Sequence, residues 1–177
     1  MASGIEVITL CDICEGATTV KSGQSYHYKE CGLDNVYLEN MEVVVCENCG
    51  VITPILPRIT LLHATIARAI ALQPYPLSGA DIRYLRKQLG LSAKQWAVLL
   101  RIDHATLLQW ENGDQTIGSQ SDALIRLLYF RVLEEKENRH ISEPLTERIA
   151  ASRLEPLPPA AVLINVNNPS VYWYQSA

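Results

Sequence analysis

The sequence of 177 residues has no uninterrupted apolar run near the ~20 residues that a bilayer-crossing helix needs. Its start also lacks the basic segment and apolar stretch of a secretory leader. We therefore expect a soluble, cytoplasmic protein of one or two domains. In a reducing cytosol, paired cysteines are more often metal ligands or redox centres than disulfides, so the five cysteines indicate a metal.

Basic residues are scarce in the first fifty positions, which hold only Lys21 and Lys29 against eight acidic residues. Because phosphate binding depends on Lys and Arg, nucleic acid is not the expected partner of this half. Residues 78–113 reverse the balance, with five basic and three acidic side chains. The net charge of −4 therefore hides two parts that we expect to have different partners.

Four of the five cysteines form two matched pairs, Cys11 with Cys14 and Cys46 with Cys49. In this C-x2-C-x31-C-x2-C layout each pair can place two sulfurs around one side of an ion, as in closed tetrahedral four-cysteine zinc sites. We predict that the four bind one Zn²⁺ per chain. A rubredoxin-like iron site uses similar spacing, so an iron or redox-sensing protein stays an alternative, as do unliganded thiols.

The chain also lacks a Ser/His/Asp set, a phosphate-binding loop and a paired-carboxylate motif. Four thiolate ligands would leave a zinc ion no open position for water or substrate. We therefore expect a binding protein and not an enzyme.

The insert between the cysteine pairs favours strands, because residues 24–29 and 36–45 are rich in β-branched and aromatic residues. So short a β module needs the metal to hold it together. Cys31 could replace one of the ligands, but it has no CxxC mate and is expected to be a free or buried thiol. His27 and His63 lack metal-ligand spacing and are expected to be ordinary packing or surface residues.

The prolines of VITPILP (51–57) are expected to interrupt any regular element. Residues 58–73 then predict a connector helix, with an apolar stripe at helical spacing that suits either a core or a dimer seam. The stripe consists of Leu61, Leu62, Thr65, Ile66, Ala69 and Ile70. The PYPLSG segment at 74–79 marks a boundary.

Helix start and stop signals are dense after this boundary. Ser78 with Asp81 predicts a cap for a helix to about Leu89, and Ser92 with Gln95 predicts a capping box for a helix over 93–100. Asp103 is expected to cap a third helix that ends at Gly113, and a long fourth helix is expected from Ser119 or Ser121 to about Lys136. Short helices joined by a tight turn indicate a helix-turn-helix. Its expected core is Leu85, Leu89, Leu91, Trp96, Ala97, Leu99, Leu100, Ile102, Leu107, Leu108, Leu124, Leu127 and Leu128.

The stretch IRYLRKQLGLSAKQWAVLLRIDHATLLQWENG (82–113) resembles the Xre/Cro-type helix-turn-helix, and its QWENG ending is similar to that family's RWExG. Together with the CDIC/CENCG framework, residues 8 to 136 resemble the two-domain zinc-finger antitoxins of the MqsA type. The resemblance implies an amino-terminal zinc module that binds a small basic toxin. It also implies a helix-turn-helix homodimer that represses its own operon at a palindromic operator.

By position, the resemblance places base-reading side chains at His104, Ala105, Thr106 and Gln109. Gln109 could pair bidentately with adenine, and Thr106 could meet a phosphate, a base edge or a thymine methyl. Two further residues, Lys94 and Gln95, are placed to hold phosphates. Trp110 is expected to pack in the bundle, and Glu111 to be an internal ion-pair partner.

Three positions depart from the family pattern: Gln109 replaces its arginine, Ala93 its glutamine, and Arg101 its turn glycine. We expect these departures to change the operator sequence more than DNA binding itself. Arg101 would be strained if its turn keeps a positive φ.

The predicted fold class is α+β, with a small zinc-stapled β module, an all-α helix-turn-helix bundle and a C-terminal extension. In that extension, VLINV and VYWY suit strands and are separated by the turn-like NNPS. The expected parts are residues 1–57 (zinc module), 58–77 (connector helix and linker), 78–137 (helix-turn-helix) and 138–177 (extension). We predict a DNA-binding repressor that acts as a type II antitoxin; the alternative is a phage-type or mobile-element-type regulator with no toxin.

Overall fold

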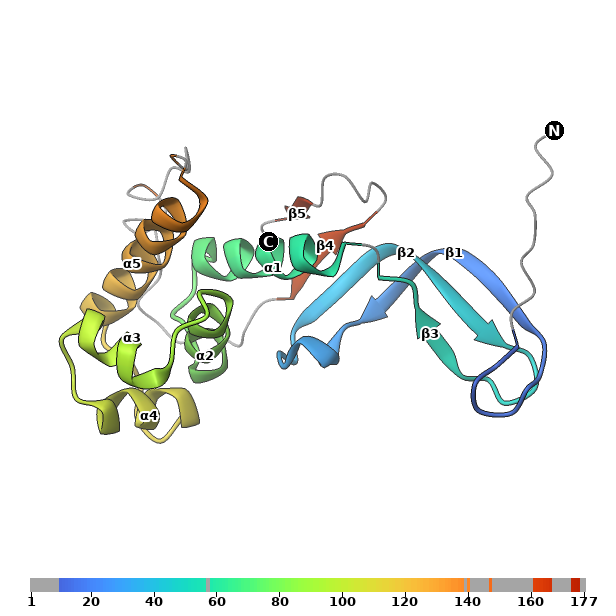
Figure 1. The fold of residues 1–177 in the computed structure, drawn as a ribbon, viewed down its shortest axis with the longest axis horizontal. Coiled ribbons are helices and arrows are strands. Elements are labelled where there is room, and N and C mark those ends of the chain that lie inside the picture. Colours follow the sequence, from blue (N-terminus) through green and yellow to red (C-terminus); the bar gives the residue numbers. More distant parts are fainter. Residues whose placement is uncertain are drawn as a thin grey trace.

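The computed structural model describes residues 10–56, 58–138, 140, 147, 161–166 and 173–175. A long β-sheet module lies at one end of the molecule and a helical bundle at the other, with α1 between them (Figure 1). The elements in order are β1 (Thr18–His27), a 3₁₀ turn (Lys29–Cys31), β2 (Val36–Cys46), β3 (Ile52–Pro54), α1 (Ile59–Leu72), α2 (Gly79–Gln88), α3 (Ala93–Leu100), α4 (His104–Asn112), α5 (Ser119–Glu137), β4 (Val162–Asn165) and β5 (Trp173–Gln175). The α+β fold class is confirmed.

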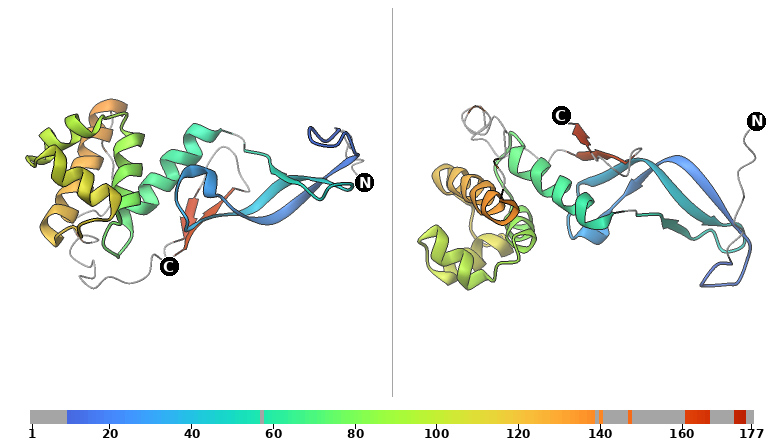
Figure 2. Two further views of the ribbon diagram at one scale, coloured as in Figure 1. Left: turned by 90° about the horizontal axis from the view of Figure 1, so that it is seen from below. Right: turned by 45° about the horizontal axis from the view of Figure 1, so that its top comes forward.

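The sheet is built around β2. One edge of β2 pairs antiparallel with β1, and β3 pairs antiparallel over Val43–Val45. At the opposite end of β2, residues Val36–Glu39 pair in parallel with β4, which in turn pairs antiparallel with β5. The two C-terminal runs therefore form strands, as predicted, and they extend the sheet of the amino-terminal module beside α1 (Figure 2).

Two expectations about this module were wrong. Strand β1 begins at Thr18, six residues before the predicted run, because its first half is largely exposed and has no apolar alternation to reveal it. Strand β3 includes Pro54, which was expected to interrupt any element. A proline is tolerated there because it is the last residue of a short edge strand, where a missing N–H costs no ladder bond.

The helix boundaries follow the local signals. Ser78 and Asp81 form a complete capping box, as do Ser92 and Gln95. Asp103 takes the N-cap position of α4 without a side-chain cap bond, and Gly113 ends that helix at a φ of 80°. Helix α5 begins at Ser119, one of its two predicted starts. These features hold α2, α3 and α4 in the arrangement predicted for a helix-turn-helix.

The stripe on α1 is core. Leu62, Ile66 and Ile70 are almost fully buried, and α1 contacts α2, α5, β4 and β5. One continuous group of buried side chains runs from the sheet through α1 into the bundle. The helix therefore joins the two ends of the molecule through packing, and the stripe is not left open as a dimer seam.

Four residues of the predicted bundle core are instead exposed: Leu99, Leu108, Leu124 and Leu127. Leu99, Leu108 and Leu124 each sit beside a leucine or isoleucine that is the buried one of the pair, and the neighbour of Leu127, Leu128, is half-buried against the core. Where two large apolar residues are adjacent in a helix, they point about 100° apart, so only one faces the core. Composition alone cannot choose between them.

The linker between α1 and α2 is held by Arg126 of α5, whose side chain is 2% exposed. Its guanidinium donates to the backbone oxygens of Ala71, Gln73 and Tyr75 at 3.0, 2.7 and 2.5 Å, and to Asp122 Oδ2 at 2.6 Å. Because one cation satisfies a carbonyl in the last turn of α1 and two in the linker that follows, it fixes the direction in which the chain leaves α1.

A polar cluster joins the sheet to both α1 and α2. The hydroxyl of Tyr28 lies 2.8 Å from His63 Nε2, and the Tyr84 hydroxyl donates to the backbone oxygen of His63 at 3.4 Å. Burial lowers the pKa of His63. The neutral imidazole is therefore the form that suits this junction.

Candidate metal centre and nucleic-acid interface

Two loops with the same backbone pattern carry the cysteine pairs. The N–H of Glu15 donates to Cys11 O at 2.8 Å, and that of Gly50 donates to Cys46 O at 3.0 Å. Glu15 and Gly50 both have a positive φ, of 55° and 71°. In each loop the first cysteine also donates its N–H to the oxygen five residues later. The chain thus makes the same tight turn twice, and each turn directs two sulfurs to one side.

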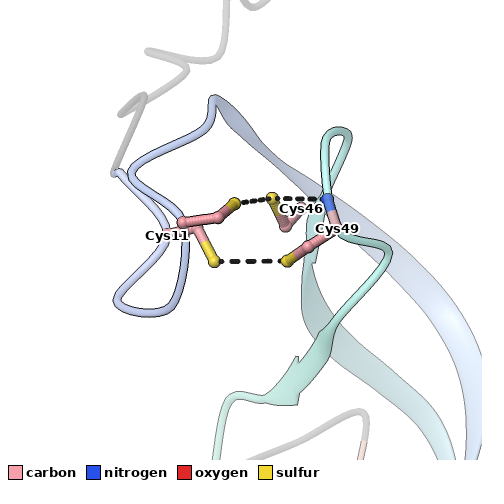
Figure 3. Close-up of side chains that lie close together, drawn as sticks. Cys11, Cys46 and Cys49 are labelled. Atoms are coloured by element: carbon pink, nitrogen blue, oxygen red, sulfur yellow. Dashed lines mark hydrogen bonds between the residues drawn. The ribbon is translucent and has the colours of Figure 1, made fainter.

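The four sulfurs meet at the end of the sheet farthest from the bundle (Figures 1 and 3). Cys11 Sγ lies 3.7 Å from Cys49 Sγ, and Cys14 Sγ lies 3.4 Å from Cys46 Sγ. All four lie within 4.8 Å of one another. Zn–S bonds of about 2.3 Å in a tetrahedron place the sulfurs roughly 3.8 Å apart. The sulfurs therefore form a cluster that suits a metal ion, and their chemistry favours zinc.

Side chains and glycines around the cluster shape it further. A hydrogen bond from the Asn48 side chain, followed by bonds with Gly16, Cys46 and Cys49, lowers the pKa of Cys14 to about 6. A Cβ at Gly16 would lie 2.7 Å from Asn48 Cβ and 3.3 Å from Cys14 Sγ, so only glycine fits. The contribution of Asn48 was missed from the sequence; its place between Cys46 and Cys49 was the available signal.

Cys31, His27 and His63 lie outside this cluster, as expected. Cys31 Sγ donates to Tyr28 O at 3.0 Å, and burial raises the pKa of its thiol. The His27 ring stacks on Tyr37 with centroids 4.4 Å apart. His63 belongs to the junction described above.

At the other end of the molecule, α3 and α4 are joined by a turn at Arg101. Arg101 has φ 57° and ψ 39°, so its backbone keeps the left-handed conformation that usually takes glycine and that is strained for a residue with a side chain, as expected. Arg101 is exposed. The turn positions α4 across α2 and α3, with which it packs.

The predicted DNA-contacting residues differ in exposure. Ala105 and Gln109 are exposed on α4, and Lys94 is exposed in the first turn of α3. His104 and Thr106 are half-buried. Contact of any of these residues with DNA stays a prediction.

Gln95 is exposed too, but its Oε1 accepts the Ser92 N–H at 2.8 Å, so its side chain already serves the capping box.

The inner side of α4 holds the helix in place. Trp110 is buried, and Glu111 accepts two hydrogen bonds from Arg86, at 2.6 and 2.8 Å. Arg83 Nε lies 3.5 Å from the same carboxylate and donates through Nη2 to Asn112 Oδ1 at 2.7 Å. Both expectations, that Trp110 packs and that Glu111 is an internal ion-pair partner, are confirmed.

The comparison with protein-family models matches residues 82–121 to a family described as helix-turn-helix. The chain therefore contains an Xre/Cro-type helix-turn-helix domain, which suggests a DNA-binding transcriptional regulator. Neither the curated proteins nor the solved structures gave a match. The likeness to MqsA-type antitoxins thus rests on the sequence motifs. No helix among the described residues is long and apolar enough to cross a membrane.

Proposed function

We propose that the chain is a cytoplasmic, homodimeric transcriptional repressor that acts as an antitoxin, with zinc in its four-cysteine cluster and a small basic protein toxin bound to its sheet module. The observation that carries the regulator part is the outward face of α4 on an Xre/Cro-type domain, with Gln109 exposed to reach base edges. Lys94, Lys87 and Arg101 are exposed cations on the same domain for phosphate contacts.

A dimer suits this proposal because two recognition helices read two half-sites about one helical turn apart. Leu124 and Leu127 lie one turn apart on α5 and are 40% and 43% exposed. They offer a second copy a short apolar strip.

The toxin part of the proposal draws on charge and on distance. The first fifty residues carry eight acidic side chains against two lysines, and four thiolates on a divalent ion would add two further negative charges. Exposed Asp12, Glu15 and Glu47 belong to the loops that carry the cysteines. Those loops lie at the opposite end of the molecule from α4 (Figure 1). A basic partner could therefore bind there without covering the DNA-binding face.

A zinc ion held by Cys11, Cys14, Cys46 and Cys49 would crosslink the two loops, and four thiolates leave it no open position for a substrate. The proposal accordingly assigns the site a structural role and the chain a binding function without catalysis. A regulator with no toxin partner is the second candidate, in which the same module recruits or senses another molecule.

The DNA part is tested with duplexes selected from a random library by the zinc-loaded full chain. Gln109→Ala should change the selected sequence, whereas Lys94→Ala should weaken all sequences and lower the salt slope by roughly one. Failure of the full chain to select any sequence would refute the repressor.

The toxin part is tested by capture from the native host with the full zinc-loaded chain as bait. We expect a small basic protein encoded beside this gene. The variant Asp12→Lys with Glu47→Lys should lose it while keeping DNA binding, because only the acidic end is altered. If no such protein is captured and the chain still binds its operator, the regulator with no toxin partner is the function that remains.

A further inference from the structure

Leu108 occupies an unusual place on α4. The inner side of the helix carries Leu107, Trp110 and Glu111, all buried. The outward stripe at i, i+3, i+4 and i+7 consists of exposed residues: Ala105, Leu108, Gln109 and Asn112. Leu107 is 0% exposed and Leu108 is 38% exposed. The large aliphatic side chain expected in the core therefore stands at the centre of the outward face.

A single exposed leucine is ordinary on a protein surface and needs no explanation by itself. The position of Leu108 gives it meaning, because Leu108 is exposed together with Ala105 and Gln109 although α4 packs on α2 and α3. Asn112, at the end of the stripe, bonds to Arg83 of α2. In a helix-turn-helix the outward stripe of the second helix is the part that enters the major groove. In the groove Leu108 is removed from water, and this burial stabilises the complex most where the side chain contacts an apolar group of the DNA.

The major groove offers one such group, the C5 methyl of thymine. The neighbours of Leu108 leave it access. Ala105, one turn earlier, is too small to obstruct it, and Asn112, one turn later, is engaged by Arg83. Gln109 beside it has the amide that pairs with adenine.

We propose that Leu108 is a specificity-determining residue that packs on a thymine methyl in the base step next to the one read by Gln109. The inference rests on the DNA part of the proposed function. It adds an apolar reader to the polar side chains predicted from the sequence, and it predicts an operator half-site with adjacent A·T pairs.

The test removes the methyl group from the DNA and the leucine from the protein, separately and together. Each thymine of the library-selected duplex is replaced in turn by deoxyuridine, which pairs identically but lacks the methyl. At one thymine per half-site, we expect deoxyuridine to weaken binding of the full chain about fourfold, the change that corresponds to burial of one methyl group. Leu108→Ala should bind more weakly and should not distinguish thymine from deoxyuridine at that position.

Leu99→Ala is the matched control, since Leu99 is 43% exposed on α3, outside the outward face of α4. It should keep the full thymine-to-deoxyuridine ratio whatever its affinity. If the wild type and Leu108→Ala show the same ratio of thymine to deoxyuridine affinity at every position, the inference is overturned, while the proposal of a repressor stands. Selection of no sequence at all would overturn the proposed function as well. Thermal unfolding of both variants checks that each is folded.

Discussion

Replacing Arg126 with methionine should destabilise the helical bundle by about 3–5 kcal/mol, the cost that usually follows removal of one partner from a buried ion pair. The guanidinium donates to Asp122 and to the backbone oxygens of Ala71, Gln73 and Tyr75. Methionine is similarly long and flexible but donates no hydrogen bond. The variant therefore leaves a buried carboxylate without its cation and three carbonyls without their donor.

The measurement is urea unfolding of the zinc-saturated full chain, followed by tryptophan fluorescence. Trp96 and Trp110 are buried in the bundle and report on it; a Trp173→Phe background removes the remaining tryptophan. Arg131→Met is the matched control on the same helix. Its side chain is 66% exposed and pairs with Glu134 and Glu135 at the surface, so it should cost less than about 0.5 kcal/mol.

An Arg126→Met variant no less stable than Arg131→Met would refute the reasoning, because the network would then contribute nothing beyond a surface pair. A further variant separates charge from packing. Adding Asp122→Asn to Arg126→Met removes the unpaired charge and should recover part of the lost stability. No recovery would assign the loss to the three unpaired carbonyls and to packing, and not to the unpaired charge of Asp122.

Three further outcomes are expected. Cys46→Ser should abolish zinc binding and order in the sheet module, measured by metal content and hydrogen exchange, yet leave DNA binding largely intact; joint loss of both would contradict the division into two parts. Arg101→Gly should raise the free energy of unfolding by roughly 0.5–1 kcal/mol in thermal melts, because glycine adopts the left-handed backbone conformation without strain, at a modest entropic cost. The same variant should bind DNA more weakly in titrations, because it lacks an exposed cation. Because burial lowers the pKa of His63, the neutral ring stabilises the fold at pH values above its ordinary pKa of about 6.5, and this contribution is lost as pH falls below that value. Unfolding at pH 7.5 and 5.5 should therefore show a larger loss for the wild type than for His63→Gln, and an equal loss would exclude the histidine as the cause.

Features that depend on a few neighbouring residues were predictable from the sequence. The capping boxes at Ser78 and Ser92 and the turn glycine Gly113 act through bonds and φ angles within one helical turn, and the structure has each of them. The cysteine cluster was predictable for a related reason. Each CxxC pair is local, and the metal chemistry itself requires the two pairs to meet.

Features that depend on distant partners were not predictable. Nothing near Arg126 in the sequence shows that it reaches carbonyls in a linker some fifty positions earlier. The exposure of Leu108 is similar, because helical spacing identifies a stripe but the partners of α4 decide which stripe is covered. The early half of β1 carries no apolar alternation, and only its pairing with β2 makes it a strand.

The parallel pairing of β2 with β4 has a consequence for the order of folding. Val36 and Leu38 are fully buried, yet their neighbours in the sheet are Val162 and Ile164, which a ribosome produces only after the whole helical bundle. During synthesis, this edge of β2 therefore lacks its β4 partner until the intervening helices have been made. Contacts so distant along the chain slow folding, and an uncovered strand edge attracts other strands. The last strands of the chain thus complete a sheet that its first strands begin.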